Sequence, residues 1–141
     1  MLEQPAVKHS AVFHRNETED VMGRYVDGFL LPVPRDKIDE YKKMAEKAGE
    51  VWKEHGALEY IECMGDDLEQ AEMVSFKKSA GASDEETVMF SWIVYESREH
   101  RDKVNKAVMN DPRIKEMMEE GAQPFDCKRM AYGGFRMIVK L

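Results

Sequence analysis

The spacing of hydrophobic and polar residues predicts four β-strands. The clearest is Thr87–Tyr95, which combines β-branched and aromatic side chains and contains neither Gly nor Pro. The other three span residues 23–33, 57–64 and 128–139. At a period of two residues, Thr87–Tyr95 is largely apolar on both faces, so we expect this strand to be covered on both sides of its sheet.

Apolar residues at steps of three and four predict three helices. The longest begins near Asp36, which suits a helix N-terminus, and ends before Gly56, which suits a C-terminus. A second helix covers residues 98–109 with Ser97 as its N-cap, and Pro112 fits the first turn of a short third helix. The order of elements predicts an α+β, ferredoxin-like βαββαβ sheet with the helices on one face.

Several segments lack a clear period. Residues 1–21 are interpreted as an N-terminal extension before a single domain at 22–141, and Met22 is a possible initiator. Residues 68–78 fit neither period, and residues 79–86 are expected to form a loop. The pair Gly133–Gly134 interrupts the last strand, which predicts a bulge or a place where a ligand or another backbone comes close.

Composition narrows the class of protein. A chain of 141 residues, 43% hydrophobic and 35% charged, is expected to form one soluble globular domain. The net charge of −7 repels nucleic acid, and no apolar run reaches the roughly 20 residues that a membrane helix needs. We therefore expect neither partner and, without a signal-peptide core, a cytoplasmic location. Cys63 and Cys127 are predicted to be reduced thiols in or near the core.

The predicted sheet has one face without cover. Two main helices cover one face of four strands, yet the strands carry large apolar residues on both faces. Leaving about five such residues in water would forfeit on the order of 10 kcal/mol, which is comparable to the stability of a whole domain. The simplest cover is a second copy of the sheet, so we predict a homodimer through the open sheet face, with a cavity between the sheets that offers room for a small-molecule ligand.

Asp27 is the candidate catalytic residue. It lies in the middle of an apolar strand, either as an edge-exposed or hydrogen-bonded aspartate or as a pocket carboxylate with a raised pKa that moves protons. The substrate-binding candidates are the aromatic and cationic side chains expected to line the same cavity: Phe29, Phe90, Trp92, Arg129 and Tyr132. This choice of face would change if any strand were shifted by one residue.

No catalytic triad, phosphate loop or metal-ligand spacing is present, so no cofactor and no metal are expected. The four histidines fall in the extension or in predicted helices, which argues against haem ligation. Glu59, Glu62, Asp66 and Asp67 are better interpreted as a polar strand end and turn than as a metal site. Glu59 and Glu62 lie on opposite faces of their strand, so at most one of them points inward. Eleven methionines suit an adaptable core or pocket, or alternatively a partner surface.

Several short segments, in the same order along the chain, carry a resemblance to a known family: Met22–Phe29, Gly56–Glu59, Phe90–Ile93, Asp111–Arg113, Pro124–Asp126, Lys128–Met130 and Tyr132–Phe135. These motifs resemble the YbaA-like family, a bacterial family of small proteins of unknown function. The resemblance implies a dimeric α/β-barrel fold, whose superfamily also holds small monooxygenases, haem-degrading proteins and lactone isomerases. It carries no established catalytic residues. Cys127 stands where the family often has Gly, which argues against a functional thiol there.

Two classes of function stay open from the sequence. One is a cofactor-independent oxygenase or isomerase that acts on a small apolar or aromatic substrate. The alternative is a non-catalytic small-molecule-binding protein, with a regulatory or stress-accessory role. A purely structural dimer is a third hypothesis, because fold alone does not fix function.

Overall fold

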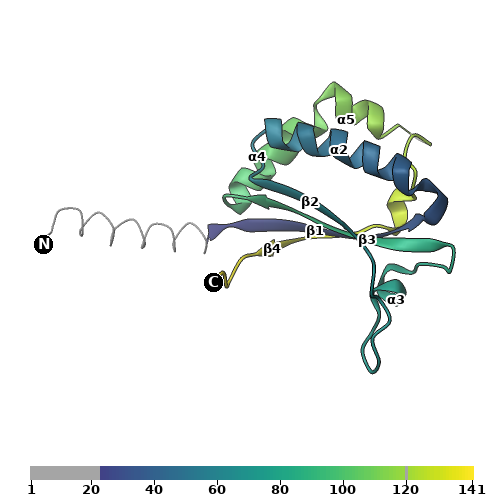
Figure 1. Ribbon diagram of the computed structural model, residues 1–141. Coiled ribbons are helices and arrows are strands. Elements are labelled where there is room, and N and C mark those ends of the chain that lie inside the picture. Colours follow the sequence, from purple (N-terminus) through teal and green to yellow (C-terminus); the bar gives the residue numbers. More distant parts are fainter. Residues whose placement is uncertain (1–22, 120) are drawn as a thin grey trace, which may run out of the picture.

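A computed structural model describes residues 23–119 and 121–141 (Figure 1). The sheet has four antiparallel strands in the order β2-β3-β1-β4. The strands are β1 (Tyr25–Pro34), β2 (Glu59–Met64), β3 (Glu86–Tyr95) and β4 (Ala131–Arg136). This order and connectivity confirm the predicted ferredoxin-like α+β fold. The predicted extension at residues 1–21 and the possible initiator Met22 lie outside the described residues.

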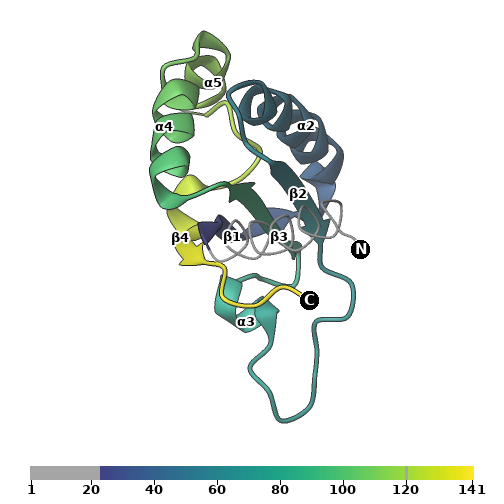
Figure 2. The ribbon, with the colours of Figure 1, turned by 90° about the vertical axis from the view of Figure 1, so that its left-hand side faces the viewer.

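The three helices α2, α4 and α5 form one layer over one face of the sheet (Figures 1 and 2). After the 3-10 turn η1 (Arg35–Lys37), the layer contains α2 (Ile38–Glu54), α4 (Arg98–Met109) and α5 (Pro112–Met117). Two predicted caps are present: the Ser97 hydroxyl accepts the amide hydrogen of His100 at 3.0 Å, and Gly56 follows α2 with a φ of +117°. Asp36 lies instead in η1, and α2 begins after Lys37 without a side-chain cap hydrogen bond. In the described part of the chain, no helix is long and apolar enough to cross a membrane.

The β2–β3 connection lies on the opposite side of the sheet from this layer (Figure 2). It contains α3 (Phe76–Ala80), which Ser75 caps and Gly81 ends with a φ of +66°. The prediction of a loop from residue 79 is therefore wrong by two residues, because the helix continues to Ala80. Since α3 contacts β1 and β3, it covers part of the face that the sequence left open.

The core lies between the sheet and the helix layer, in two buried clusters. One contains Val51, Ile93, Tyr95, Val108 and their neighbours beneath α4 and α5. The second packs side chains of β1 and β3 against α2, and it contains Leu31, Val33, Tyr41, Ala45 and Met89. In both clusters the strand residues are alternate residues of their strands, which all point to the same face of the sheet. The apolar pattern of the strands therefore determines which face of the sheet meets the helices.

Strand β4 is shorter than predicted, because residues 127–129 form the 3-10 turn η2 (Cys127–Arg129). The double glycine does not form a bulge, and that prediction is wrong: Gly133 pairs with Gly28 and Gly134 pairs with Asp27 in an uninterrupted ladder. The close approach at Gly134 comes from the phenol of Tyr25, which occupies the space that a Cβ atom would need.

Candidate functional site

The six predicted site residues do not share one face. Asp27, Phe29 and Tyr132 are on the helix-facing parity, whereas Phe90 and Trp92 are on the opposite parity. The register sets this division, because Gly28 and not Asp27 pairs with Trp92. Residues opposite each other in a ladder share a face. The prediction that these side chains line one cavity is therefore wrong, although each strand was found near its predicted place.

Arg129 lies apart from the other five residues. It belongs to η2, and its guanidinium donates two hydrogen bonds to the Glu86 carboxylate at 2.8 and 2.9 Å and one to the Gly81 carbonyl at 2.7 Å. The hydrogen bonds from Arg129 lower the pKa of Glu86 to about 2. Arg129 thus joins the turn before β4 to the start of β3.

Asp27 is buried beneath α4, with 1% of its surface exposed. Its carboxylate lies 3.5 Å from Nη1 of Arg101, and Asn105 donates to it at 3.4 Å. Arg101 also donates to the hydroxyls of Tyr132 at 2.9 Å and Tyr25 at 3.3 Å. This arrangement supports the interpretation of Asp27 as a paired aspartate that attaches α4 to the sheet. A catalytic role for Asp27 stays a prediction.

Asn105 extends this polar cluster to a second pair of rings. Its side-chain oxygen accepts hydrogen bonds from Nε1 of Trp52 at 3.2 Å and from the hydroxyl of Tyr95 at 3.1 Å. Burial raises the pKa of Tyr95, and the nearby Asp27 charge acts in the same direction. The phenol therefore stays neutral and serves as a fixed donor between the strand and the helix.

Glu62, which is partly buried, forms a second polar site on β2. Its two carboxylate oxygens accept hydrogen bonds from the hydroxyl of Tyr41 at 2.8 Å and from that of Tyr60 at 3.0 Å. Burial raises the pKa of Glu62, and hydrogen bonds from Tyr41, Tyr60 and Ser91 only partly offset this effect. The carboxyl group is thus poised to hold or release a proton in a largely apolar environment.

The position of Tyr60 depends on a glycine in α2. A Cβ atom built on Gly49 would lie 2.7 Å from Cδ1 of Tyr60, which is closer than carbon atoms approach one another. Because Gly49 has no side chain, the ring of Tyr60 fits beneath α2 and its hydroxyl reaches Glu62. Tyr41 approaches the same carboxylate from the helix side, so the two phenols hold it between the two layers.

A cavity of about 160 Å³ adjoins Glu62 between the sheet, α2, α5 and the chain that leads to η2. Aromatic rings form much of its wall: Phe29, Tyr41, Trp52, Tyr60 and Phe125. Thioethers form another part: Met44, Met117, Met118 and Met130. A wider groove of about 920 Å³ runs between α2 and β2 and shares Tyr41, Tyr60 and Glu62 with the cavity. Glu62 can therefore be reached from two sides.

The sequence contained a partial signal for this site. The period of β2 placed at most one of Glu59 and Glu62 inward, and the inward one is Glu62. Sequence reasoning missed its partner Tyr41, which is 21 residues away on α2 and looked like an ordinary member of the apolar stripe. No local sequence pattern indicates that the hydroxyl of Tyr41 on α2 would reach the carboxylate of Glu62 on the sheet.

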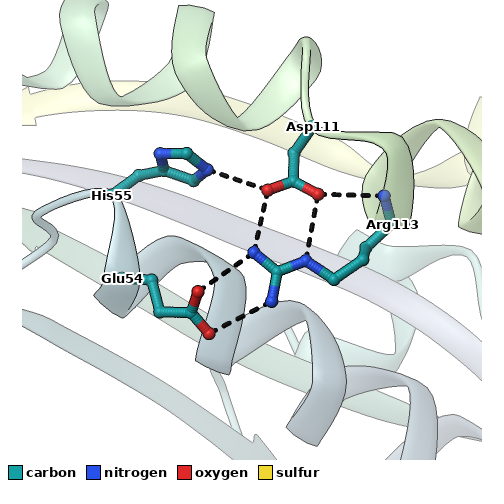
Figure 3. Close-up of polar contacts among 4 residues, drawn as sticks. All are labelled: Glu54, His55, Asp111 and Arg113. Carbon is teal, nitrogen blue, oxygen red and sulfur yellow. Dashed lines mark hydrogen bonds and ion pairs between the residues drawn. The ribbon is translucent and has the colours of Figure 1, made fainter.

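A third polar cluster lies where α2 ends and α5 begins (Figure 3). Arg113 donates to both oxygens of Glu54 at 3.1 Å, and it also pairs with Asp111 at 2.8 Å. His55 lies 2.9 Å from the same aspartate, whose pKa is strongly lowered by hydrogen bonds from Arg113 and His55. Each of the four side chains has a partner within the cluster, so this cluster fastens two helix ends together.

The described residues contain no group of three metal-ligating His, Cys, Asp or Glu side chains. Glu59 and Glu62, from the acidic set considered in the sequence, point to opposite faces of β2. Cys63 and Cys127 are free, but both are exposed, so their predicted place in or near the core is wrong. Cys63 lies near the end of the edge strand β2, and Cys127 begins the turn η2 before β4.

The fold and the site define a class: a ferredoxin-like α+β domain with a small pocket between its sheet and its helices. Residues 24–127 match the family described as "Protein of unknown function (DUF1428)", and the chain belongs to this family. It is 47% identical over 116 residues to the uncharacterized protein YbaA of Escherichia coli K12 and to that of Shigella flexneri, covering 82% of this chain and 97% of either relative.

A solved structure is also similar: the crystal structure of an uncharacterized NIPSNAP-like domain protein from Burkholderia xenovorans. The TM-score is 0.48 and the sequence identity 13%, over 80% of this chain and 84% of that chain. At this TM-score the likeness does not support a fold assignment. The fold assignment rests on the strand order and connections of the chain itself.

Proposed function

We propose that this protein binds a small, largely apolar molecule in the cavity between its sheet and its helix layer, with Glu62 as the polar group that meets it. The observation that carries this proposal is the partly buried Glu62 carboxylate, held by Tyr41 and Tyr60 on the wall of a cavity that is otherwise mostly apolar. Small-molecule sites typically combine such a wall with a few convergent polar groups.

The methionines of the cavity wall provide a direct test. In a sample with ¹³C-labelled methionine methyl groups, we expect one-ring probe molecules to shift the signals of Met44, Met117 and Met130. Met73 lies on the distant β2–β3 connection and is 77% exposed, so its signal serves as the internal control. If a set of neutral, cationic and anionic one-ring probes at millimolar concentration leaves all three cavity signals unchanged, the proposal is wrong.

A second candidate function is proton transfer to and from carbon, as in an isomerase. The specific observation in favour is the raised pKa of Glu62, which makes the carboxylate a stronger base than an exposed one. In such a reaction a substrate C–H bond breaks, its proton passes to Glu62, and the electron pair delocalises into an adjacent carbonyl. Return of the proton to another carbon completes the isomerisation. Cofactor-independent oxygenation would begin with the same loss of a proton.

Deuterium exchange tests this candidate. A bound ligand, first identified by comparing native and denatured mass spectra of purified protein, is incubated with the protein in D₂O, and incorporation at carbon is measured. We expect Glu62→Gln to abolish incorporation and Glu59→Gln to preserve it. Glu59 is the matched control, because it carries the same charge on the same strand but on the opposite face. Equal incorporation with both variants would refute proton transfer by Glu62.

We also propose that two copies pair through the sheet face away from the helices. That face exposes 47% of Phe90 and 62% of Phe135, with Trp92, Ile61 and Leu30 only partly buried beside them. Phe90 contacts Trp92 and Phe76 with ring centroids 5.5 and 5.9 Å apart, so the patch is continuous. An exposed apolar patch of this kind suits a second copy of itself.

Native mass spectrometry at micromolar concentration tests the pairing. We expect twice the chain mass for the wild type and a single chain mass for Phe90→Asp. Met109→Asp is the control, because Met109 is 42% exposed on α4 in the helix layer and should leave the dimer intact. A monomeric wild type would refute the proposed pairing and would leave the interlayer cavity unaffected.

A further inference from the structure

The Glu62 carboxylate has hydrogen-bond donors but no counterion. Its donors are neutral hydroxyls: the phenols of Tyr41 and Tyr60, together with the side chain of Ser91. Across residues 23–119 and 121–141, no Lys, Arg or His nitrogen lies within 4.0 Å of this carboxylate. Asp27, the fully buried acid of the helix-facing side, differs from the partly buried Glu62 because it has Arg101 as its partner. Charged groups that are taken out of water are usually paired with an opposite charge, so the partly buried Glu62 has an open place for a cation.

The cavity beside Glu62 also lacks positive charge. Its wall contains one acidic residue, Glu62, and no Lys, Arg or His. A carboxylate has about four lone-pair sites, and the hydroxyls of Tyr41, Tyr60 and Ser91 occupy no more than three of them. The remaining capacity can accept a hydrogen bond from an N–H donor that enters the cavity. A charge-assisted bond of this kind is roughly twice as strong as a neutral one.

The aromatic wall of the cavity also favours a positively charged ligand. Tyr41 and Phe125 meet edge to face at 5.6 Å, and Trp52 and Tyr60 lie 6.1 Å apart, so ring surfaces surround the space near Glu62. The face of an aromatic ring attracts a cation, and sets of such rings recognise substituted ammonium groups. The net charge of −7 further favours the approach of a cation over that of an anion.

We infer that the natural ligand of this cavity is a small organic cation, a primary or substituted amine on an apolar body of about one ring, whose nitrogen meets Glu62. The size follows from the volume: about 160 Å³ is close to the roughly 150 Å³ of an engineered apolar cavity in another protein that binds benzene. This inference rests on the proposed function and adds the chemical class of the ligand.

Three probes of one size and different charge test the inference: benzylamine, benzyl alcohol and benzoate. Each is titrated into protein with ¹³C-labelled methionine methyl groups, and the dissociation constant is obtained from the shifts of Met44, Met117 and Met130. We expect benzylamine to bind about tenfold or more tightly than benzyl alcohol, and benzoate to bind most weakly, because a desolvated charge pair adds to the apolar contact.

Two variants assign the preference to one carboxylate. Glu62→Gln should bring the affinities for benzylamine and benzyl alcohol to within about threefold of each other, since the charge is gone and the shape is kept. Glu59→Gln should retain the wild-type preference, because this residue faces the other side of β2. If Glu62→Gln fails to fold, the ranking of the three probes on the wild type still decides the inference.

The outcomes separate this inference from the proposed function. If none of the probes shifts the cavity methionines, the proposed small-molecule site itself is wrong. If benzyl alcohol or benzoate binds as tightly as benzylamine, the cavity binds small molecules but the inferred cationic ligand is wrong. If benzylamine is preferred and Glu62→Gln keeps that preference, the charge of Glu62 is not its source and the inference is overturned.

Discussion

The pairing of Asp27 with Arg101 leads to a double-mutant cycle. Asp27 is 1% exposed, the side chain of Arg101 is 15% exposed, and their charged atoms are 3.5 Å apart. At an effective dielectric constant of roughly 20, two unit charges at this distance attract by about 5 kcal/mol. Desolvation of both groups offsets much of this attraction, so the pair contributes little net stability, but leaving one charge without its partner is costly.

We expect Asp27→Asn to lower the free energy of unfolding by about 3 kcal/mol, the lower end of the range for breaking a buried pair. The lower end applies because Arg101 can rehydrate at its exposed side and keeps its hydrogen bonds to Tyr25 and Tyr132. Arg101→Met should cost more, since the Asp27 carboxylate is more deeply buried. The double variant Asp27→Asn/Arg101→Met should cost less than the sum of the two single variants by about 2 kcal/mol or more.

Urea denaturation at pH 7, followed by tryptophan fluorescence, measures all four proteins. Trp52 reports on this region directly, because its indole donates to Asn105, the residue that also donates to Asp27. Strictly additive losses in the double variant would refute the reasoning, since they would show that the two residues act independently. A loss below about 1 kcal/mol for Asp27→Asn would also contradict it, because the remaining Arg101 charge would then have no need of a partner.

Three further changes test the local packing and electrostatics. Gly49→Ala should destabilise the protein by about 1–2 kcal/mol, because the added Cβ would lie 2.7 Å from the ring of Tyr60. This crowding exceeds the gain of about 1 kcal/mol in helix propensity. A variant more stable than the wild type in thermal melts would contradict this expectation. Ser97→Ala removes the N-cap of α4 and should cost about 1 kcal/mol in urea denaturation, whereas no loss would mean that the cap is dispensable. The third change concerns acid stability. The pKa of Glu86 falls from 4.5 to about 2 on folding, so the stability that its pairing with Arg129 contributes is complete above pH 4.5 and is lost as the pH falls toward 2. In acid titrations followed by circular dichroism, Arg129→Met should lose less stability over this pH range than the wild type. An unchanged acid profile would argue against the pair.

Much of the fold was predictable from short-range pattern. Thr87–Tyr95 lies within β3 one residue from its start, and α4 begins after Ser97 as its capping residue predicted. Such features depend on neighbours within about four residues, where steric and hydrogen-bonding preferences act directly. The βαββαβ order then leaves few ways to arrange four antiparallel strands with short connections. The apolar character of both faces of β3 was likewise visible in the sequence.

The candidate site was decided by the tertiary structure. Trp92 was grouped with Asp27, but the register of β1 against β3 pairs Trp92 with Gly28, and a shift of one residue exchanges the two faces. The exposed strand end at η2 could not be distinguished from β4 by pattern, so Arg129 was placed on a strand although it belongs to the preceding turn.

By itself, the sequence determined the four strands, the three helices of the layer, their order, the Ser97 cap and the alternation of faces along β2. Only the tertiary structure decided which distant groups meet: Tyr41 with Glu62 across 21 residues, and Arg101 with Asp27 across 74. The physical reason is the range of the interactions. Periodicity records which side of an element is apolar, whereas the partner of a polar group on that side depends on how two layers are set against each other. That setting is fixed by side-chain packing over the whole core, including the absence of a side chain at Gly49.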